Sequence, residues 1–314
     1  WLKARAPRPF ALSLSLSLSL SLFLLRAPGE PQAIVGRVAM ELGDLDEGLK
    51  AVASGGHVLS CQEVVGVQAS LMLLQRQQKH ASIYLWGKIY GQSGDYFIAY
   101  GLSEAETELP AKTYYWAGED FEFSALPRLT EETATKLAAM GLDGKPLMGQ
   151  PQAPIYAATD AATGGEATPS GLVDLDRLSQ VVQEIDFDTA VVPFGAHVLN
   201  ETRTIVRSSD FVGLAAEEAT DLSKYMHFRT PADIGALRAH ARTDTEFYAN
   251  FLDRLDDDLP KGCWGVRQDL SANLVTLRSL SWPGYIAYHV PRTTNFGGMY
   301  FGYAKKNRDL PFML

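Results

Sequence analysis

The residues that could do chemistry in this chain are its histidines, its cysteines and one run of aspartates. A metal or nucleophilic site needs such side chains at short fixed spacings, such as paired cysteines or two histidines on one helical face. The six histidines lack that spacing; they are His57, His80, His197, His227, His240 and His289. Cys61 and Cys263 have no neighbouring Cys or His, which excludes a CxxC motif and zinc-ligand spacing. We predict structural or surface roles for the histidines and reduced, cytosolic thiols for both cysteines.

The aspartate run comprises Asp253, Asp256, Asp257 and Asp258. A calcium site or an acid–base pair is conceivable there, but the run lacks the alternating oxygen ligands and central glycine of an EF-hand loop. The pattern favours the solvated end of a helix. The signatures GxGxxG after a strand, GxxxxGK[ST], GxSxG and HExxH are also absent. The sequence therefore predicts no enzyme, with no catalytic, cofactor-binding or metal-ligating residues and no cofactor.

Two other groups of side chains could meet a partner. Lys305, Lys306 and Arg308 form a small basic cluster, which fits either simple solubility or contact with an acidic partner. Aromatic residues gather in two stretches, 86–100 and 264–303, beyond what one face of a small sheet needs. Either two layers cover the sheet, or one face binds a partner, because aromatic side chains are enriched at interface hot spots.

Hydrophobic spacing predicts the elements that position these residues. Helices are expected at five places. The first is Glu63–Gln78, with Val64, Val65, Val67, Leu71, Met72 and Leu74 on its buried face, and the second is Thr130–Ala139. Two more pass through Leu175, Leu178, Val182 and Ile185 and through Ala215, Ala219, Leu222 and Tyr225, and the fifth starts at a capping box of Thr243 and Glu246 and continues through Phe247, Phe251 and Leu255. Strands are expected at 83–90 and 96–100 as a hairpin, at 114–123, at 190–193, and in an antiparallel meander from 264 to 303.

Together these elements predict an α+β fold in which amphipathic helices pack on antiparallel hairpin and meander sheets. The expected regions are 40–142, with helices and a hairpin, and 172–314, with helices and the meander. Between them, residues 143–171 are rich in Ala, Gly, Thr and Pro and predict a flexible linker or long loop.

Residues 1–39 differ from the rest of the chain. They begin with Trp1 and contain a strictly alternating Leu-Ser tract, whereas the first methionine is Met40. We expect this segment to be translated upstream sequence, disordered, with Met40 as the true start. The alternative is a secretory signal, with Lys3, Arg5 and Arg8 before an apolar stretch, which the sequon at Asn200 would also fit. The tract is too short and polar for a membrane span.

The charge balance argues against nucleic-acid and anionic-membrane partners. The chain of 314 residues has a formal net charge of −9. Residues 1–39 hold five Lys or Arg and one Glu, so the remainder has a net charge of −13. Binding phosphates requires a basic face instead.

Eight stretches, in order, resemble the radial spoke head protein 9 homologue family of ciliary axonemes. They are Ser70–Leu74 (SLMLL), Leu85–Lys88 (LWGK), Asp95–Glu104 (DYFIAYGLSE), Tyr225–Pro231 (YMHFRTP), Pro260–Trp264 (PKGCW), Arg278–Gly284 (RSLSWPG), His289–Asn295 (HVPRTTN) and Lys306–Leu314 (KNRDLPFML). Residues 1–39 and the segment around Ala157–Gly165 depart from the family pattern. The resemblance covers nearly all of the chain from Met40 onward.

The resemblance implies a non-enzymatic scaffold subunit of the radial spoke head, located in the axoneme, a cytoskeletal structure of the cilium or flagellum. It implies assembly with the paralogous spoke head proteins 4 and 6 and transmission of central-pair contact to dynein during ciliary movement. The alternative that the residues leave open is a secreted module that binds carbohydrate or protein through its aromatic residues. If Trp282 is buried in the core, Trp282→Ala should cost about 3 to 5 kcal/mol.

Overall fold

The computed structural model describes residues 40–41, 45–78, 80, 82–103, 109–142, 144–156, 169–200, 204–231 and 251–313. The predictions for residues 1–39, for His240 and for the capping box at Thr243 fall outside the described residues. None of the helices that the structure describes is long and apolar enough to cross a bilayer.

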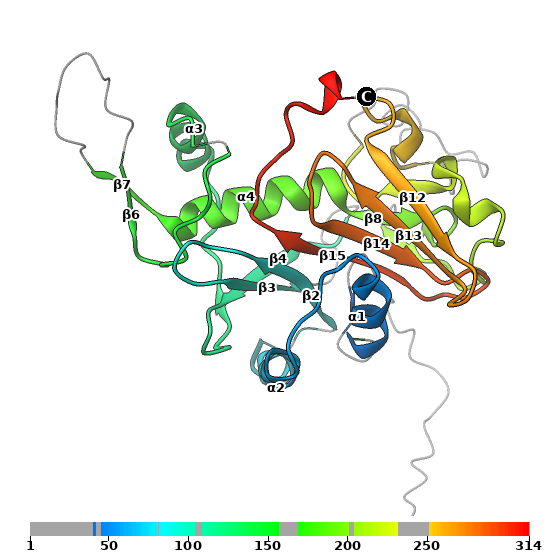
Figure 1. Cartoon of the computed structure of the whole chain (residues 1–314). Helices are drawn as coiled ribbons and strands as arrows, with labels where there is room; N and C mark the ends of the chain where they lie inside the picture. The colour runs from blue at the N-terminus through cyan, green and yellow to red at the C-terminus, as the bar shows by residue number, and fades with distance from the viewer. Residues whose placement is uncertain are drawn as a thin grey trace, which may run out of the picture. The chain divides into compact units, whose positions relative to one another are not determined.

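One mixed sheet runs through the fold (Figure 1). Its strands follow the order β12-β13-β14-β15-β2-β3-β4-β5, and β1 pairs with β2 beside this path. Their bounds are β1 Met40–Glu41, β2 Ser82–Ile89, β3 Tyr96–Leu102, β4 Lys112–Ala117, β5 Ser124–Ala125, β12 Trp264–Asp269, β13 Leu274–Ser279, β14 Tyr285–His289 and β15 Phe296–Gly302. The predicted hairpin and the predicted antiparallel meander are both confirmed. The sequence did not indicate that these two units share one sheet.

Helices cover both faces of this sheet, because successive side chains of a strand point to opposite sides. One face packs against α4 (Asp174–Thr189), and the other against α1 (Leu45–Ala53) and α2 (Cys61–Gln78), as Figure 1 shows. The α4 face is rich in aromatic residues, including Tyr84, Trp86, Tyr96, Tyr100, Trp264, Trp282, Tyr285 and Tyr300. The α1–α2 face is mainly aliphatic, including Leu45, Val52, Val67, Leu71, Leu74, Ile83, Leu85, Ile286 and Met299. Two covering layers thus account for most of the aromatic surplus, and the α+β class is confirmed.

The joint between the hairpin and the meander is the parallel pairing of β2 with β15, where Gly87 lies opposite Tyr300. A β-bulge between Leu85 and Gly87 shifts the register of β2 against β3 at this point. Gly87 has a φ of +151°, and a Cβ atom there would lie 2.1 Å from the carbonyl oxygen of Tyr300. The close approach of the two strands therefore requires glycine at position 87.

Smaller elements flank the sheet. Among the described residues, β6 (Pro154–Tyr156) pairs with β7 (Pro169–Val173), β8 (Val191–Pro193) with β11 (Tyr225–His227), and β9 (His197–Leu199) with β10 (Ile205–Arg207). Helix α3 (Glu131–Ala139) is confirmed, with its predicted cap, because the hydroxyl of Thr130 accepts a hydrogen bond from the backbone N–H of Thr133 at 3.3 Å.

Helix α2 confirms one prediction and corrects part of another. It begins at Cys61, where Ser60 and Glu63 form a capping box with hydrogen bonds of 2.6 and 3.2 Å. Val67, Leu71 and Leu74 are buried as predicted. Val65 and Met72 are 66% and 53% exposed, so the prediction that they widen the buried face is wrong.

The helix predicted through Ala215, Ala219, Leu222 and Tyr225 is wrong. Two 3-10 helices, η2 (Glu218–Thr220) and η3 (Leu222–Lys224), lie there, and Tyr225 begins β11. The carboxylate of Asp221 accepts hydrogen bonds from the backbone N–H and the hydroxyl of Ser223, at 3.0 and 2.6 Å. Such a local side-chain contact competes with continuation of a helix.

The helix predicted from Thr243 does not include the two positions that the structure describes. Phe251 lies in irregular backbone, where it is buried against residues of β8 and β11. Leu255 begins the 3-10 helix η5 (Leu255–Asp257). Between them Arg254 forms an isolated β-bridge with Met226, which holds the chain extended.

The predicted division into 40–142, 143–171 and 172–314 stays a prediction. In the described part of the middle segment, Leu147 is fully buried and Ile155 packs with Leu137 and Leu172. Residues 157–168 lie outside the described residues.

Candidate functional site

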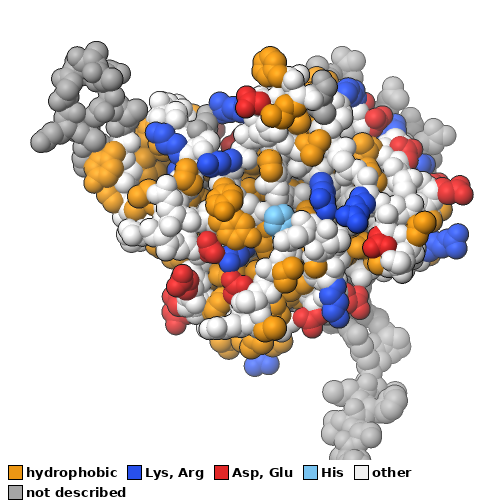
Figure 2. All heavy atoms as spheres, in the orientation of Figure 1, with side chains coloured by type: hydrophobic (Ala, Val, Ile, Leu, Met, Phe, Trp, Pro, Cys, Tyr) orange, Lys and Arg blue, Asp and Glu red, His pale blue; other side chains and the backbone are white. Residues whose placement is uncertain are grey.

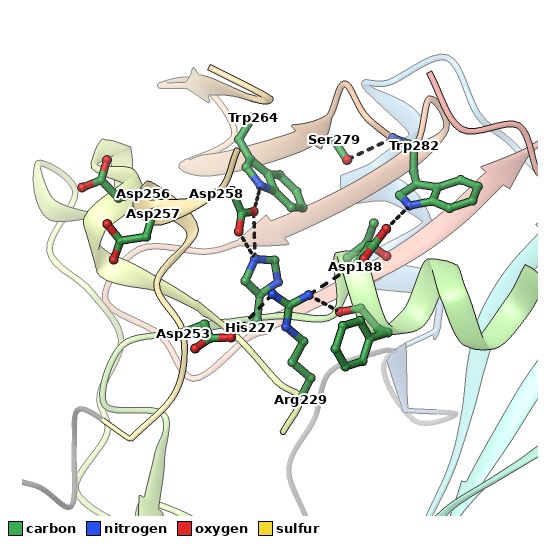
Figure 3. Close-up of polar contacts among 12 residues, drawn as sticks. Asp188, His227, Arg229, Asp253, Asp256, Asp257, Asp258, Trp264, Ser279 and Trp282 are labelled. Carbon is green, nitrogen blue, oxygen red and sulfur yellow. Dashed lines mark hydrogen bonds and ion pairs between the residues drawn. The ribbon is translucent and has the colours of Figure 1, made fainter. Parts of the chain in front are cut away.

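Four of the eight stretches that carry the family resemblance meet at the C-terminal end of α4. They are Tyr225–Pro231, Pro260–Trp264, Arg278–Gly284 and Lys306–Leu314, and each contributes a side chain to one group of polar contacts. Figure 3 shows most of this group, which we call the α4-end network: Asp188, His227, Arg229, Asp253, Asp258, Trp264, Trp282 and Lys306. The network is the candidate functional site of the chain.

Asp258 is the first of two carboxylates that organise the network. Its oxygens lie 2.9 and 2.8 Å from Nε2 of His227, a side chain that is 1% exposed. Nε1–H of Trp264 donates a hydrogen bond of 2.7 Å to the same carboxylate. Although burial favours the neutral acid, the hydrogen bonds from His227 and Trp264 and the nearby Arg229 lower the pKa of Asp258. Asp258 therefore joins β11 to β12 as a carboxylate.

Asp188 is the second carboxylate and belongs to α4. Nε1–H of Trp282 donates to it at 2.8 Å, and Nζ of Lys306 lies 2.8 Å from the same oxygen. Lys306 also lies 5.4 Å from the centre of the Trp282 ring and 3.6 Å from Glu184. An acid near a helix C-terminus is unfavourable because of the helix dipole, so these external donors stabilise Asp188 there.

Arg229 links Asp188 to a third carboxylate, Asp253. Its guanidinium lies 3.9 Å from Asp188 and 3.5 Å from Asp253, and it donates a hydrogen bond of 2.9 Å to the carbonyl of Phe187. It also lies 4.5 Å from the centre of the Phe187 ring, a cation–π arrangement. The planar guanidinium thereby ties β11 to the last turn of α4.

The predicted solvated helix end at Asp253–Asp258 is wrong for two of its four aspartates. Asp253 is 9% exposed and Asp258 is bonded within the network, whereas Asp256 and Asp257 lie in η5 and point away from it in Figure 3. Their partners, His227 and Arg229, lie in another part of the sequence, so no local pattern indicated that these two carboxylates are bonded. No group of three or more potential metal ligands occurs among the described residues.

A cavity of about 260 Å³ opens beside the network and is lined by Arg229, Asp258, Cys263, Trp264, Trp282 and Lys306 among others. Arg229 and Lys306 lie within ion-pair distance of Asp188, and Asp258 is bonded to His227 and Trp264. Burial, together with the charge of Asp258, raises the pKa of the Cys263 thiol to about 11, which keeps the thiol protonated and unreactive at neutral pH. The contacts around the cavity therefore hold the surrounding elements together.

Two further carboxylates of α4 anchor the other half of the sheet. The hydroxyl of Tyr96 donates a hydrogen bond of 2.9 Å to Asp174, which is 1% exposed. Asp186 accepts from Nε1–H of Trp86 at 3.3 Å and forms an ion pair with Lys112. Sequence reasoning missed all three anchoring aspartates of α4, since it used only the apolar face of the helix. A usable signal was present, because Asp186 and Asp188 stand at the helix end where acids are disfavoured.

The remaining candidate residues lie apart from the network. His57 stacks on Phe301, His80 lies 2.6 Å from the hydroxyl of Tyr115, and His197 and His289 are buried near Phe296. These positions fit the predicted structural roles. Of the basic cluster, Lys306 belongs to the network, whereas Lys305 is exposed.

The tryptophans that a carbohydrate-binding surface would need are largely inside the protein. Trp86, Trp264 and Trp282 are 4%, 7% and 2% exposed. The indole N–H of each tryptophan donates a hydrogen bond to an aspartate of this chain. The structure therefore offers no support for the aromatic carbohydrate-binding alternative at these three positions.

Comparison with known proteins identifies relatives over most of the chain. No family model matches the chain. A protein from Mus musculus named "Radial spoke head protein 9 homolog" is 35% identical over 282 residues, which cover 88% of this chain and 100% of the relative. Proteins of the same name from Homo sapiens and Danio rerio are 34% and 32% identical, again over 88% of this chain and 100% of each relative. Identity at this level across the full length of each relative confirms the resemblance of the eight stretches, and the chain belongs to the radial spoke head protein 9 homologue family.

Proposed function

We propose that this chain is a structural subunit of the radial spoke head, required for assembly of the head and for transmitting central-pair contact to the dynein arms. Family membership carries the coarser part of this statement. It places the chain among radial spoke head components, in the axoneme of cilia or flagella, where it associates with other spoke head subunits. The finer part, assembly with the paralogous spoke head proteins 4 and 6, is our proposal.

The single observation that best supports a mechanical role is the α4-end network. Four family stretches from different elements converge there on half-buried carboxylates, through two indole N–H groups, one imidazole and one ammonium group. Directional contacts between buried groups fix the relative orientation of the elements that carry them more tightly than apolar packing alone. The network thus gives stiffness to a sheet already covered on both faces.

The absence of a catalytic arrangement among the described residues fits this role. The carboxylates are engaged in ion pairs and hydrogen bonds, and the buried thiol is unreactive. We propose that the chain acts without catalysis, as a scaffold whose product is a rigid head.

Cryo-electron tomography of axonemes from cells that lack the protein tests the proposal. Incomplete or missing spoke heads and impaired beating are the expected result, and restoration by the wild-type chain is the control. Normal spoke heads in cells lacking the protein would contradict it. Affinity purification from wild-type axonemes should recover the spoke head proteins 4 and 6, and their absence would remove the finer part.

A matched pair of variants tests the mechanical part. Trp282→Phe removes the indole N–H that Asp188 accepts, but keeps an aromatic ring in the core. Lys136→Glu changes an exposed charge on α3, away from the network. We expect weakened beating with assembled heads for the first variant and normal beating for the second. Equal beating of the two would mean that the network has no mechanical role.

A further inference from the structure

Strand β12 ends the main sheet and is paired on one side only among the described residues. Its pairing partner is β13, with Arg267 opposite Thr276 and Gln268 opposite Val275. Such an edge presents backbone N–H and C=O groups that can pair with a further strand.

The direction of each backbone group of β12 follows from one hydrogen bond just before the strand. The carbonyl of Cys263 accepts a hydrogen bond from the backbone N–H of Leu280 at 2.8 Å, so Cys263 and Leu280 are a hydrogen-bonded pair. Because such pairs alternate along an antiparallel ladder, Gly265, Arg267 and Asp269 also point their backbone groups at β13. Val266 and Gln268 therefore point theirs to the open edge, where no described backbone group pairs with them.

The charge pattern along this edge is complementary to that of a second, antiparallel copy of the same edge. Arg267 and Asp269 carry opposite charges two residues apart, with Gln268 between them. Asp269 is held in place because its Oδ1 accepts hydrogen bonds from the backbone N–H and the hydroxyl of Ser271, at 2.9 and 2.6 Å. Just beyond it, Leu270 is 82% exposed. In Figure 2 the end of the sheet formed by β12–β14 carries exposed Lys and Arg side chains on its visible face.

We propose that β12 pairs edge to edge with β12 of a second copy of this chain, in antiparallel register centred on Gln268. The two sheets would then form one continuous sheet across a two-fold axis. In this register Gln268 lies opposite itself, and Val266 lies opposite Leu270 of the second copy. Arg267 lies opposite Asp269 of the second copy, and this contact occurs twice by symmetry.

Charge and hydrogen bonding select this register over its neighbours. Centring on Gln268 makes the outward groups of Val266 and Gln268 the hydrogen-bonded positions of the new ladder, as their direction requires. It also places each Arg–Asp pair at a non-hydrogen-bonded position, where facing side chains are closest. Centring on Val266 would pair more of β12 with itself, since Trp264 would lie opposite Gln268. That register would set Arg267 opposite Gly265, however, so no opposite charges would face each other, and Leu270 would stay uncovered. The inference does not depend on the proposed role in the radial spoke.

Analytical ultracentrifugation of the full chain tests the proposal. Because residues 266–270 of the two copies form only a small interface, the dimer should be weak and should become visible at a concentration of roughly 100 µM. Arg267→Glu sets two carboxylates against each other twice and should weaken the dimer roughly tenfold or more. Lys136→Glu makes the same charge change on α3 and should leave it unchanged.

Mixing two variants separates pairing from misfolding. Arg267→Glu and Asp269→Lys should each fail to dimerise alone, because each brings like charges together. In the mixture every facing pair is again opposite in charge, so a heterodimer should form with close to wild-type affinity. Thermal unfolding of each variant checks that it is folded. Failure of two folded variants to dimerise when mixed would overturn the register.

A cross-link at the two-fold axis gives an independent measurement. Gln268→Cys in a Cys61→Ser background places two thiols opposite each other at about 5.5 Å between Cα atoms, within disulfide range. Mild oxidation should yield a covalent dimer, whereas Ser271→Cys in the same background should not. A wild-type chain that stays monomeric throughout, with no cross-link at position 268, would overturn the proposal. The proposal would also be overturned if the backbone amides of Val266 and Gln268 were protected from hydrogen exchange only when another spoke head subunit is bound. The edge of β12 would then be the binding site for that subunit.

Discussion

The two faces of the main sheet are buried in different ways. On the α1–α2 face aliphatic residues such as Leu71, Leu85 and Met299 fill the contact, and polar contacts such as that of His80 with Tyr115 are few. On the α4 face aromatic side chains reach the helix with their polar ends, and the aspartates of α4 accept from Tyr96, Trp86 and Trp282. Both faces exclude water, and α2 makes one directional contact with the sheet, the ion pair of Glu63 with Lys88 at 2.7 Å. The α4 face, in contrast, combines burial with a row of such contacts.

This difference separates stability from positioning. Apolar packing allows a helix to shift or rotate slightly on a sheet as long as the volume between them stays filled. A carboxylate shielded from water that loses its hydrogen-bond donor, in contrast, destabilises the fold even after a small displacement. The α1–α2 face therefore supplies burial, and the α4 face fixes where α4 lies along the strands. Variants that alter one face at a time test this difference between the faces.

The largest expected effect is that of Trp282→Ala on the α4 face. Trp282 is 2% exposed and bonded to Asp188, so the substitution should lower the free energy of unfolding by about 3 to 5 kcal/mol, measured by urea denaturation. Trp282→Phe keeps most of the volume and should cost about 1 to 2 kcal/mol, from the lost hydrogen bond. If the Phe variant were as stable as wild type, the polar contact would add nothing to packing on this face.

The next effect concerns the joint that both faces share. Gly87→Ala would place a Cβ atom 2.1 Å from the carbonyl oxygen of Tyr300, so β2 and β15 must move apart. We expect a loss of about 3 kcal/mol in the free energy of unfolding, because backbone atoms cannot yield as a flexible side chain can. Gly265→Ala is the matched control, since no atom lies within 4 Å of its added Cβ atom. A Gly87→Ala protein as stable as the control would contradict the tight joint.

The sequence could predict the apolar packing of both faces better than the polar contacts of the α4 face. Periodicity identified α2, α4, the hairpin and the meander, because long apolar patterns reflect burial directly. It missed the parallel pairing of β2 with β15, since two strands about two hundred residues apart leave no local pattern when they meet. It also missed Asp174, Asp186, Asp188 and Asp258 as anchors, because their partners come from other elements. The helix predicted at 215–225 failed where the carboxylate of Asp221 competes with the helical backbone.

Acid should weaken the α4 side through its buried histidines. Burial, with a contribution from Arg207, lowers the pKa of His197 to about 3, and burial lowers that of His289 to about 4, while its Nε2 accepts a hydrogen bond of 3.2 Å from the N–H of Leu214. Below about pH 6.5 the unfolded chain binds protons that the folded chain does not. Each of the two histidines should therefore reduce the free energy of unfolding as the pH falls below 6.5, with a slope that approaches about 1.4 kcal/mol per pH unit near pH 5.

His197→Leu isolates one of these contributions. Both nitrogens of His197 are buried without a hydrogen-bond partner among the described residues, and its ring lies 4.7 Å from that of Phe228. An apolar side chain of similar volume should leave the protein at least as stable at pH 7. Between pH 6.5 and 5.5 the variant should lose about 1 kcal/mol less than wild type, measured by urea denaturation at each pH. Identical pH slopes would show that His197 is protonated in the folded state or exposed to water.

The smallest expected effect is at the exposed edge of the α4-end network. Lys306 is 39% exposed in its ion pairs with Asp188 and Glu184, so Lys306→Met should cost less than about 1 kcal/mol, and the loss should shrink further in high salt. Lys306→Arg keeps the charge and should be neutral. The buried indole N–H of Trp282, in contrast, is not screened by salt. If Lys306→Met cost more than Trp282→Phe, Asp188 would be held mainly from the solvent side, and the α4 face would owe its directional contacts to surface charge instead of to buried donors.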